Sequence, residues 1–246
     1  MDAYGGSDVG RVRPINQDYV LVINKKTGPF SGLFILADGM GGHKAGEVAS
    51  KLAAESAASY AAEAKGSSCV SILDQTVAYA NKKLFDYSKE NPDMVGMGTT
   101  LVIAGVCGST LYVANVGDSR LYLIDESITQ ITIDHSLVWE MVSMGKITKE
   151  EARNHERKNV ITRAVGVEEE VVPDLFEIEL GEESIILLCS DGLSNMLEDH
   201  EIKRIVSGRG TLGQKVERLI ERANEKGGRD NISVILARNE DTWRSL

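Results

Sequence analysis

Residues 33–64 read LFILADGMGGHKAGEVASKLAAESAASYAAEA and combine a strand, a glycine-rich turn and a helix. The apolar run at residues 33–37 is typical of a buried strand. From Ala45 to about Ala64, apolar residues recur three and four positions apart, which predicts a helix with one buried stripe. Between the two elements lies Asp38-Gly39, so a carboxylate is expected where the strand ends.

Similar runs continue on both sides of this stretch. Strands are predicted at residues 19–23 and 33–37, as a hairpin, at 99–106, 110–116 and 121–124, as a meander, and at 175–180, 185–189 and 232–236. Further helices are predicted at 70–88, at 199–206 with Asp199 as N-cap, and at 213–226. Helices in pairs between groups of strands favour an α+β fold with two stacked, largely antiparallel sheets and flanking helices.

Residues 134–166 differ from their surroundings because they are polar and rich in charge. Short helices are expected at 137–144 and 149–157, within an insertion that lies over the surface. No repeat or low-complexity linker divides the chain, which favours a single domain over residues 1–246.

Composition excludes several classes of function. The 246 residues include 27 basic and 37 acidic side chains, for a formal charge of -10 that is spread along the chain. This charge argues against nucleic acid as a partner. Apolar runs are far shorter than the roughly 20 residues that cross a bilayer, and the N-terminus has no leader pattern, so a soluble, cytoplasmic protein is expected with no membrane partner. The compact single domain makes a monomer the default expectation. Cys69, Cys107 and Cys189 are expected to be reduced packing residues.

Five aspartates stand at the ends of predicted strands, namely Asp18, Asp38, Asp118, Asp191 and Asp230. Any one of them alone favours a turn, because Asp and Gly are both turn residues. If the fold brings all five to one edge of the sheets, their mutual repulsion requires cations among them. Oxygen-only ligation favours Mg²⁺ or Mn²⁺ over Zn²⁺, and Cys and His are scarce near these positions.

Other phosphate chemistries do not fit the sequence. The glycine-rich turn after Asp38 matches neither a Walker A loop nor a dinucleotide-binding fingerprint. No cysteine is followed by an arginine at the spacing of a cysteine-dependent phosphatase. Residues 189–192 also lack the first glycine of a nucleophile elbow. A covalent enzyme is therefore disfavoured.

Six motifs, in order along the chain, resemble those of the metal-dependent protein phosphatases, the type 2C serine/threonine phosphatases, in their compact bacterial form. They are SDVGRVRPINQD at 7–18, DGMGGH at 38–43, GTT at 98–100, NVGDSR at 115–120, SDGL at 190–193 and RDNIS at 229–233. The resemblance covers almost the whole chain. It implies a four-layer α-β-β-α sandwich with a metal cluster at one end. It also implies that residues 134–166 form the flap, a mobile element that shapes the phosphopeptide groove.

The resemblance further implies two to three bound Mn²⁺ or Mg²⁺ ions. Asp38, Asp191 and Asp230 would hold the first ion, Asp38 and the carbonyl of Gly39 the second, and Asp118 and Asp191 the third. This ligand set would make the chain a hydrolase of phosphoric monoesters, with manganese or magnesium as its cofactor.

Catalysis would then depend on Arg13, Asp18 and Asp38. Arg13 would bind the substrate phosphate, although without the motif a solvated surface arginine is the usual interpretation. Asp18 would orient metal-bound water. The implied reaction is hydrolysis of phosphoserine and phosphothreonine by in-line attack of a metal-bridging water or hydroxide. The partners would be phosphoproteins, including a cognate serine/threonine kinase whose signalling the enzyme reverses.

Two positions depart from many eukaryotic relatives. Gln17 replaces a glutamate ligand, and Met40 replaces a histidine proposed as general acid. Either a metal-bound water or His43 would protonate the leaving alkoxide, and water is favoured. A surface role is expected for the remaining histidines, which are His135, His155 and His200.

Two alternatives come from other classes. A catalytically silent binding module would have lost metal carboxylates, yet all five are present. A metal-dependent nuclease also uses clustered acids, but the charge of -10 and the lack of a basic stripe count against it.

Overall fold

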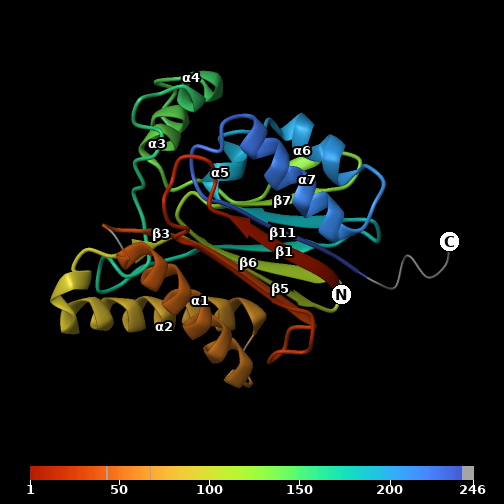
Figure 1. Ribbon diagram of the computed structural model, residues 1–246. Coiled ribbons are helices and arrows are strands. Elements are labelled where there is room, and N and C mark those ends of the chain that lie inside the picture. The colour runs from red at the N-terminus through yellow and green to blue at the C-terminus, as the bar shows by residue number, and fades with distance from the viewer. Residues whose placement is uncertain (43, 67, 240–246) are drawn as a thin grey trace.

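The computed structural model describes residues 1–42, 44–66 and 68–239, and its strands form two stacked antiparallel sheets (Figure 1). The first sheet has the order β1 (Asp2–Asp8), β11 (Ile232–Arg238), β10 (Ile185–Cys189), β7 (Arg120–Ile124) and β8 (Ile128–Gln130). The second has the order β2 (Asp18–Ile23), β3 (Gly32–Met40), β5 (Leu101–Cys107), β6 (Thr110–Val116) and β9 (Asp174–Glu179), and β4 (Gly98–Thr99) pairs with β3.

Helices cover the outer faces of both sheets (Figure 1). The second sheet carries α1 (Ala45–Glu63) and α2 (Cys69–Glu90), and the first carries α5 (Asp191–Ser194), α6 (Asp199–Val206) and α7 (Leu212–Glu225). A single 3₁₀ turn, η1 (Pro92–Met94), follows α2. The expected α+β fold, a four-layer α-β-β-α sandwich, is confirmed. Among the described residues, no helix combines the length and apolar character that crossing a bilayer requires.

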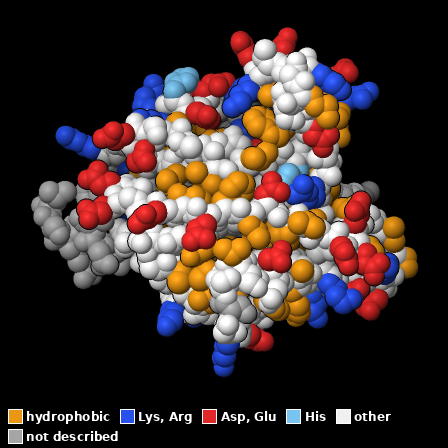
Figure 2. Space-filling view, turned by 180° about the vertical axis from the view of Figure 1, so that it is seen from behind, with side chains coloured by type: hydrophobic (Ala, Val, Ile, Leu, Met, Phe, Trp, Pro, Cys, Tyr) orange, Lys and Arg blue, Asp and Glu red, His pale blue; other side chains and the backbone are white. Residues whose placement is uncertain are grey.

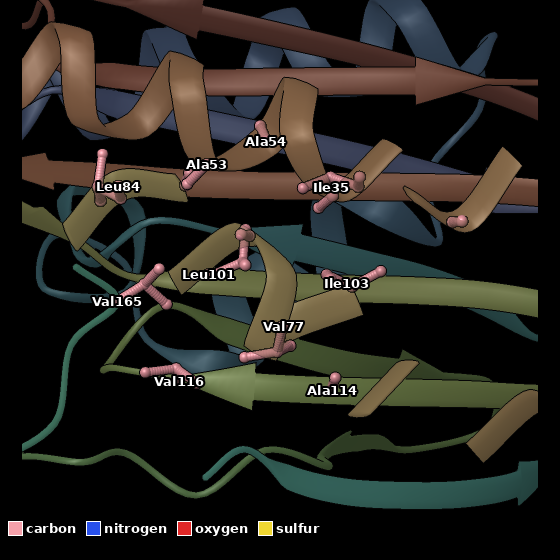
Figure 3. Close-up of a cluster of buried hydrophobic side chains, with 14 of the residues drawn as sticks. Ile35, Ala53, Ala54, Val77, Leu84, Leu101, Ile103, Ala114, Val116 and Val165 are labelled. Carbon is pink, nitrogen blue, oxygen red and sulfur yellow. The ribbon is translucent and has the colours of Figure 1, made fainter. Parts of the chain in front are cut away.

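Strand β3 has hydrophobic core on both of its faces, one against the helices and one against the other sheet. This explains its continuous apolar sequence. Ile35 points toward α1 and α2, whereas Phe34 and Leu36 point toward the other sheet. Figure 3 shows the outer layer, where Ala53 of α1 lies near larger side chains of the sheet and of α2. Alanines on the buried stripe let α1 approach the sheet closely. A strand that is buried on both faces has no solvent-facing positions, so its sequence does not alternate between apolar and polar residues.

The flap, residues 134–166, projects from the body beside the ends of the strands (Figure 1). It contains α3 (Leu137–Ser143) and α4 (Lys149–Arg153). The helix α4 ends four residues before the expected position 157. At its base the two chain segments are joined by backbone hydrogen bonds, from Leu137 N to Val160 O at 2.9 Å and from Thr162 N to His135 O at 2.9 Å. We call this paired base the flap stem.

Some expectations were wrong in detail. The strands β1 and β8 and the short helix α5 were not predicted, because their sequences lack an apolar run of adequate length. The N-cap of α6 is Glu198, whose side chain takes part in a capping box, and not Asp199. Asp38-Gly39 forms no turn, because β3 continues to Met40 and pairs there with β4.

The expected meander is also wrong, because β7 does not follow β6 in the same sheet. Strand β6 belongs to the second sheet and β7 to the first. The chain therefore crosses between the sheets at Gly117 and Asp118. This crossing places Asp118 at the mouth between the layers, where the other strand-end aspartates also lie.

Candidate metal centre

Four of the five strand-end aspartates line one pocket of about 220 Å³ at the end of the sandwich. They are Asp38, Asp118, Asp191 and Asp230, and Arg13, Gly39 and Met40 also line the pocket. Each aspartate comes from a different segment of the chain, so only the tertiary fold brings them together. Asp18 is not on the pocket wall and lies buried beside Asp38.

Asp18 and Asp38 are cross-strand neighbours in the β2–β3 hairpin. Asp18 is 8% exposed, and its Oδ2 accepts a hydrogen bond from Ser190 Oγ at 2.8 Å. Thr100 holds the Asp38 backbone from the other side. Its Oγ1 accepts from Asp38 N and its own N donates to Asp38 O, both at 2.9 Å. The two carboxylates are thus fixed side by side, an arrangement that like charges disfavour.

Gly39 is required by close packing between β3 and α1. A Cβ atom at this position would lie 1.9 Å from Gly46 O and 2.7 Å from Gln17 O. Gly39 N donates to Gln17 O at 3.0 Å. The first turn of α1 is therefore seated directly against the segment that carries Asp38.

Asp191 and Asp230 lie at the ends of β10 and β11. Asp191 is the first residue of α5, and its Oδ2 accepts a hydrogen bond from Asn195 Nδ2 at 2.9 Å. Asp230 Oδ2 accepts a hydrogen bond from Arg13 Nη2 at 2.8 Å. The Arg13 side chain is 48% exposed, so it lies at the rim of the pocket beside the carboxylates.

Asn231 positions the loop that carries Arg13. Its Nδ2 donates to Val9 O at 3.0 Å and to Ile15 O at 2.9 Å, and its Oδ1 accepts from Gln17 N at 2.8 Å. One amide side chain therefore ties both ends of the loop to the start of β11. The sequence placed Asn231 in a motif, but gave no sign that it fixes the distant Arg13 loop.

Burial and mutual repulsion raise the carboxyl pKa values throughout the centre. Burial raises the pKa of Asp18 to about 6, although serine hydroxyls that bond its carboxylate oppose the shift. Burial and the charge of Asp134 raise the pKa of Asp118 to about 7. The pKa values of Asp38 and Asp191 lie well above the ordinary range, because both are buried among the other carboxylates. These groups are costly to ionise together without a counter-charge.

The donor set fits hard divalent cations. Asp18 Oδ1 is buried and accepts no hydrogen bond from any residue that the structure describes. All candidate ligands are oxygen atoms, which is the preference of Mg²⁺ and Mn²⁺. Within the described ranges, no three His, Cys, Asp or Glu side chains are already drawn into a coordination shell. The carboxylates instead surround an open pocket, which leaves room for ions among them.

The histidines differ from expectation in part. His43 lies outside the described residues. His135 was expected at the surface, but it is only 7% exposed and bonds to Gly117, directly before Asp118. The correction has a physical cause, because His135 lies in the flap stem, where its backbone pairs with Thr162 and its ring bonds to the Gly117 turn. His155 is partly exposed and His200 exposed. The described cysteines are all free, as expected.

The fold and the centre together define a class of protein, a four-layer α-β-β-α sandwich with buried carboxylates at one end. The family model described as Protein phosphatase 2C matches residues 10–237. The chain belongs to the protein phosphatase 2C family.

Two curated relatives match over nearly their whole length. The serine/threonine phosphatase Stp of Listeria monocytogenes is 42% identical over 99% of this chain and 98% of its own. The protein phosphatase PhpP of Streptococcus pneumoniae is 38% identical over 94% of each chain.

Solved structures agree with the fold. The serine/threonine phosphatase Stp1 of Staphylococcus aureus has a TM-score of 0.90 at 38% identity, over 98% of this chain and 95% of that one. The catalytic domain of the serine threonine protein phosphatase PstP, in complex with 2 manganese ions, has a TM-score of 0.83 at 38% identity, over 95% and 96% of the two chains.

Proposed function

We propose that this chain is a metal-dependent serine/threonine protein phosphatase, which hydrolyses phosphoserine and phosphothreonine in proteins. The observation that carries the proposal is the pocket of about 220 Å³ in which four aspartates from separate segments meet Arg13. Family membership supports the reaction, and the manganese complex of PstP supports the cofactor.

The cofactor is two to three Mn²⁺ or Mg²⁺ ions. The first would be held by Asp38, Asp191 and Asp230, the second by Asp38 and the Gly39 carbonyl, and the third by Asp118 and Asp191. When bound, the ions supply an activated water near neutral pH and neutralise charge on the phosphoryl oxygens. This requirement accounts for a centre whose carboxylates repel one another in the protein alone.

Arg13 binds the substrate phosphate. Its guanidinium has five N–H donors in a fixed plane, and Asp230 occupies only Nη2. The remaining donors match the spacing of two phosphate oxygens. Because the side chain is half exposed at the rim, it can meet a phosphate that arrives on a protein.

Asp18 orients the attacking water, and its own orientation is fixed by Ser190. The leaving alkoxide takes its proton from water in the pocket. Met40 lines that pocket, but a thioether has no proton to give. His43 is the other candidate donor that the sequence offers.

The flap borders a second and larger cavity, which accommodates the polypeptide around the phosphorylated residue. This cavity has a volume of about 510 Å³, and its walls include Trp139 and Arg153 of the flap. Asp118 and Asp191 line both cavities, so the two spaces meet at the carboxylates. A substrate chain under the flap therefore has direct access to the metal centre.

The partners of the enzyme are phosphoproteins, including a cognate serine/threonine kinase whose signalling it reverses. A single catalytic domain over residues 1–246, acting as a cytoplasmic monomer, suits this role. On the face shown in Figure 2, acidic side chains are scattered between basic ones and Lys and Arg form no continuous stripe. This distribution favours protein substrates over nucleic acid.

Hydrolysis of para-nitrophenyl phosphate and of a phosphothreonine peptide tests the proposal. We expect both activities to disappear after thorough chelation and to return with Mn²⁺. Asp191→Ala should prevent the recovery, whereas Asp93→Asn, at an exposed position away from the pocket, should not. Activity that persists without metal would overturn the proposal.

A flap deletion separates recognition from chemistry. Removal of the flap helices should lower turnover of the phosphopeptide more than turnover of the small aryl phosphate. Equal losses on both substrates would refute a role of the flap in recognition.

A further inference from the structure

His135 lies at the point where the flap stem meets the acidic centre. It belongs to the first segment of the stem and is 7% exposed, so its ring is enclosed by the protein. It lies outside the six sequence motifs. A buried imidazole that accepts a backbone hydrogen bond on one ring nitrogen and faces a carboxylate with the other has a specific structural task.

The backbone of Gly117 is held by His135 on both its polar groups. Gly117 N donates to His135 Nδ1 at 3.0 Å, and His135 N donates to Gly117 O at 2.9 Å. Because Nδ1 accepts a hydrogen bond, the proton of the neutral ring is on Nε2. Gly117 has a φ of +106°, and a Cβ there would lie 2.6 Å from Thr100 Cγ2. The turn is thus pressed against Thr100 on one side and fixed by His135 on the other.

The opposite edge of the ring faces Asp174. His135 Nε2 lies 3.1 Å from Asp174 Oδ2, but outside hydrogen-bonding geometry. Asp174 Oδ1 accepts a hydrogen bond from Arg163 Nη1 at 2.7 Å, and Thr162 N donates to His135 O at 2.9 Å. The imidazole therefore has one well-aligned contact, toward Gly117, and one looser electrostatic contact, toward Asp174 at the start of β9. The flap stem is joined to His135 through its backbone carbonyl and through Arg163, which shares Asp174.

We propose that His135 is a positioning residue that holds the Gly117 turn so that the Asp118 carboxylate faces the metal pocket, and that joins this turn to the flap stem. The inference rests on the proposed function, because it concerns the third metal position of the same centre. Asp118 follows Gly117 directly, so a rotation of the Gly117 peptide would redirect its carboxylate. His135 itself touches neither the substrate nor the ions.

Two amide substitutions separate the two sides of the ring. The Oδ1 of asparagine can occupy the place of Nδ1, so His135→Asn keeps an acceptor for Gly117 N. The amide of glutamine reaches the place of Nε2 instead, so His135→Gln keeps the contact with Asp174 and loses the acceptor. The aligned contact is the one toward Gly117, so the asparagine variant should behave like the parent and the glutamine variant should not.

The first experiment is metal-independent. Exchange of the Gly117 amide hydrogen, measured by NMR on the metal-free chain, should be at least about tenfold faster in His135→Gln than in the parent. His135→Asn should remain within about threefold of the parent. His155→Gln is the matched control, because His155 Nδ1 also accepts a backbone hydrogen bond, from Arg157 N at 3.1 Å, but lies partly exposed within the flap.

The second experiment measures Mn²⁺ binding by the paramagnetic resonance of the free ion. His135→Gln should weaken the weakest Mn²⁺ site by about tenfold or more and leave the tighter sites unchanged. Asp118→Asn should remove that weakest site, and His155→Gln should bind as the parent does.

The outcomes separate this inference from the proposed function. Equal exchange and equal Mn²⁺ binding in His135→Gln and the parent would overturn the inference, as would equal damage in the asparagine and glutamine variants. A parent chain that binds no Mn²⁺ would contradict the proposed function, and the amide-exchange result would still decide whether His135 holds the Gly117 turn.

Discussion

Replacement of Asp18 by asparagine tests whether the acidic centre destabilises the metal-free protein. Burial raises the pKa of Asp18 to about 6 from an ordinary value of 3.8. The folded chain therefore retains a proton that the unfolded chain releases, so the free energy of unfolding falls as pH rises from about 4 to about 6 and stays lower above that. A shift of about two units corresponds to an upper bound of about 3 kcal/mol at neutral pH. Asp18→Asn removes the charge at nearly constant shape, so the metal-free variant should be more stable than the parent by ~2–3 kcal/mol.

Thermal unfolding in the presence of chelator measures this difference. At pH 7.5 the melting temperature of Asp18→Asn should exceed that of the parent by about 4–10 °C for a chain of this size. At pH 5 the gain should shrink to roughly half, because the parent carboxyl is then largely protonated in the folded state. With Mn²⁺ present the order should reverse, since the cation stabilises the carboxylate form. A metal-free variant that melts below the parent at pH 7.5, or a gain that is the same at both pH values, would refute the electrostatic reasoning. Asp93→Asn, at an exposed site, is the control.

Three further substitutions have expected outcomes. Gly39→Ala should lower the free energy of unfolding in urea by more than about 3 kcal/mol, because its Cβ would overlap a carbonyl of α1. Gly42→Ala, where a Cβ has no neighbour within 4 Å, should change it little, and equal losses would contradict the packing argument. Glu201→Gln should destabilise by ~1–3 kcal/mol at pH 7, because a hydrogen bond from the lysine after α7 lowers the pKa of that carboxyl to about 2. The difference should diminish below pH 4.5 as Glu201 is protonated, and a pH-independent difference would argue against the ion pair. In phosphatase assays Asp191→Ala should be more damaging than Asp118→Ala, because the proposed ligand set gives Asp118 only the third ion, and parity would contradict that assignment.

The layers of the fold could be predicted from the sequence because the main strands and helices have regular apolar spacing within their own residues. Residues 33–37 and the alanine-rich helix after them are regular enough to identify from apolar spacing alone, and the structure confirms both. The strand β1 was missed because its sequence, DAYGGSD, has no alternation, and its pairing with β11 comes from the tertiary fold. The assignment of β7 to the wrong sheet has the same cause, since nothing local distinguishes a hairpin turn from a crossing between sheets.

The sequence predicted which carboxylates form the candidate metal centre, but not which residues hold them in place. Five aspartates near strand ends are visible in the sequence, and four of them line one pocket. The residues that hold them were not visible as supports. Asn231 fixes the Arg13 loop across more than 200 positions, and His135 fixes a turn 18 positions earlier in the chain. Such contacts depend on backbone groups, whose positions no residue pattern encodes.

The central claim is that carboxylates from distant segments surround divalent cations, and a crystal grown with manganese tests it most directly. Anomalous diffraction at the manganese absorption edge should place at least two ions in the pocket, with Asp38, Asp191 and Asp230 directed at them. A crystal in which these side chains point away from one another, with no anomalous peak among them, would contradict the account.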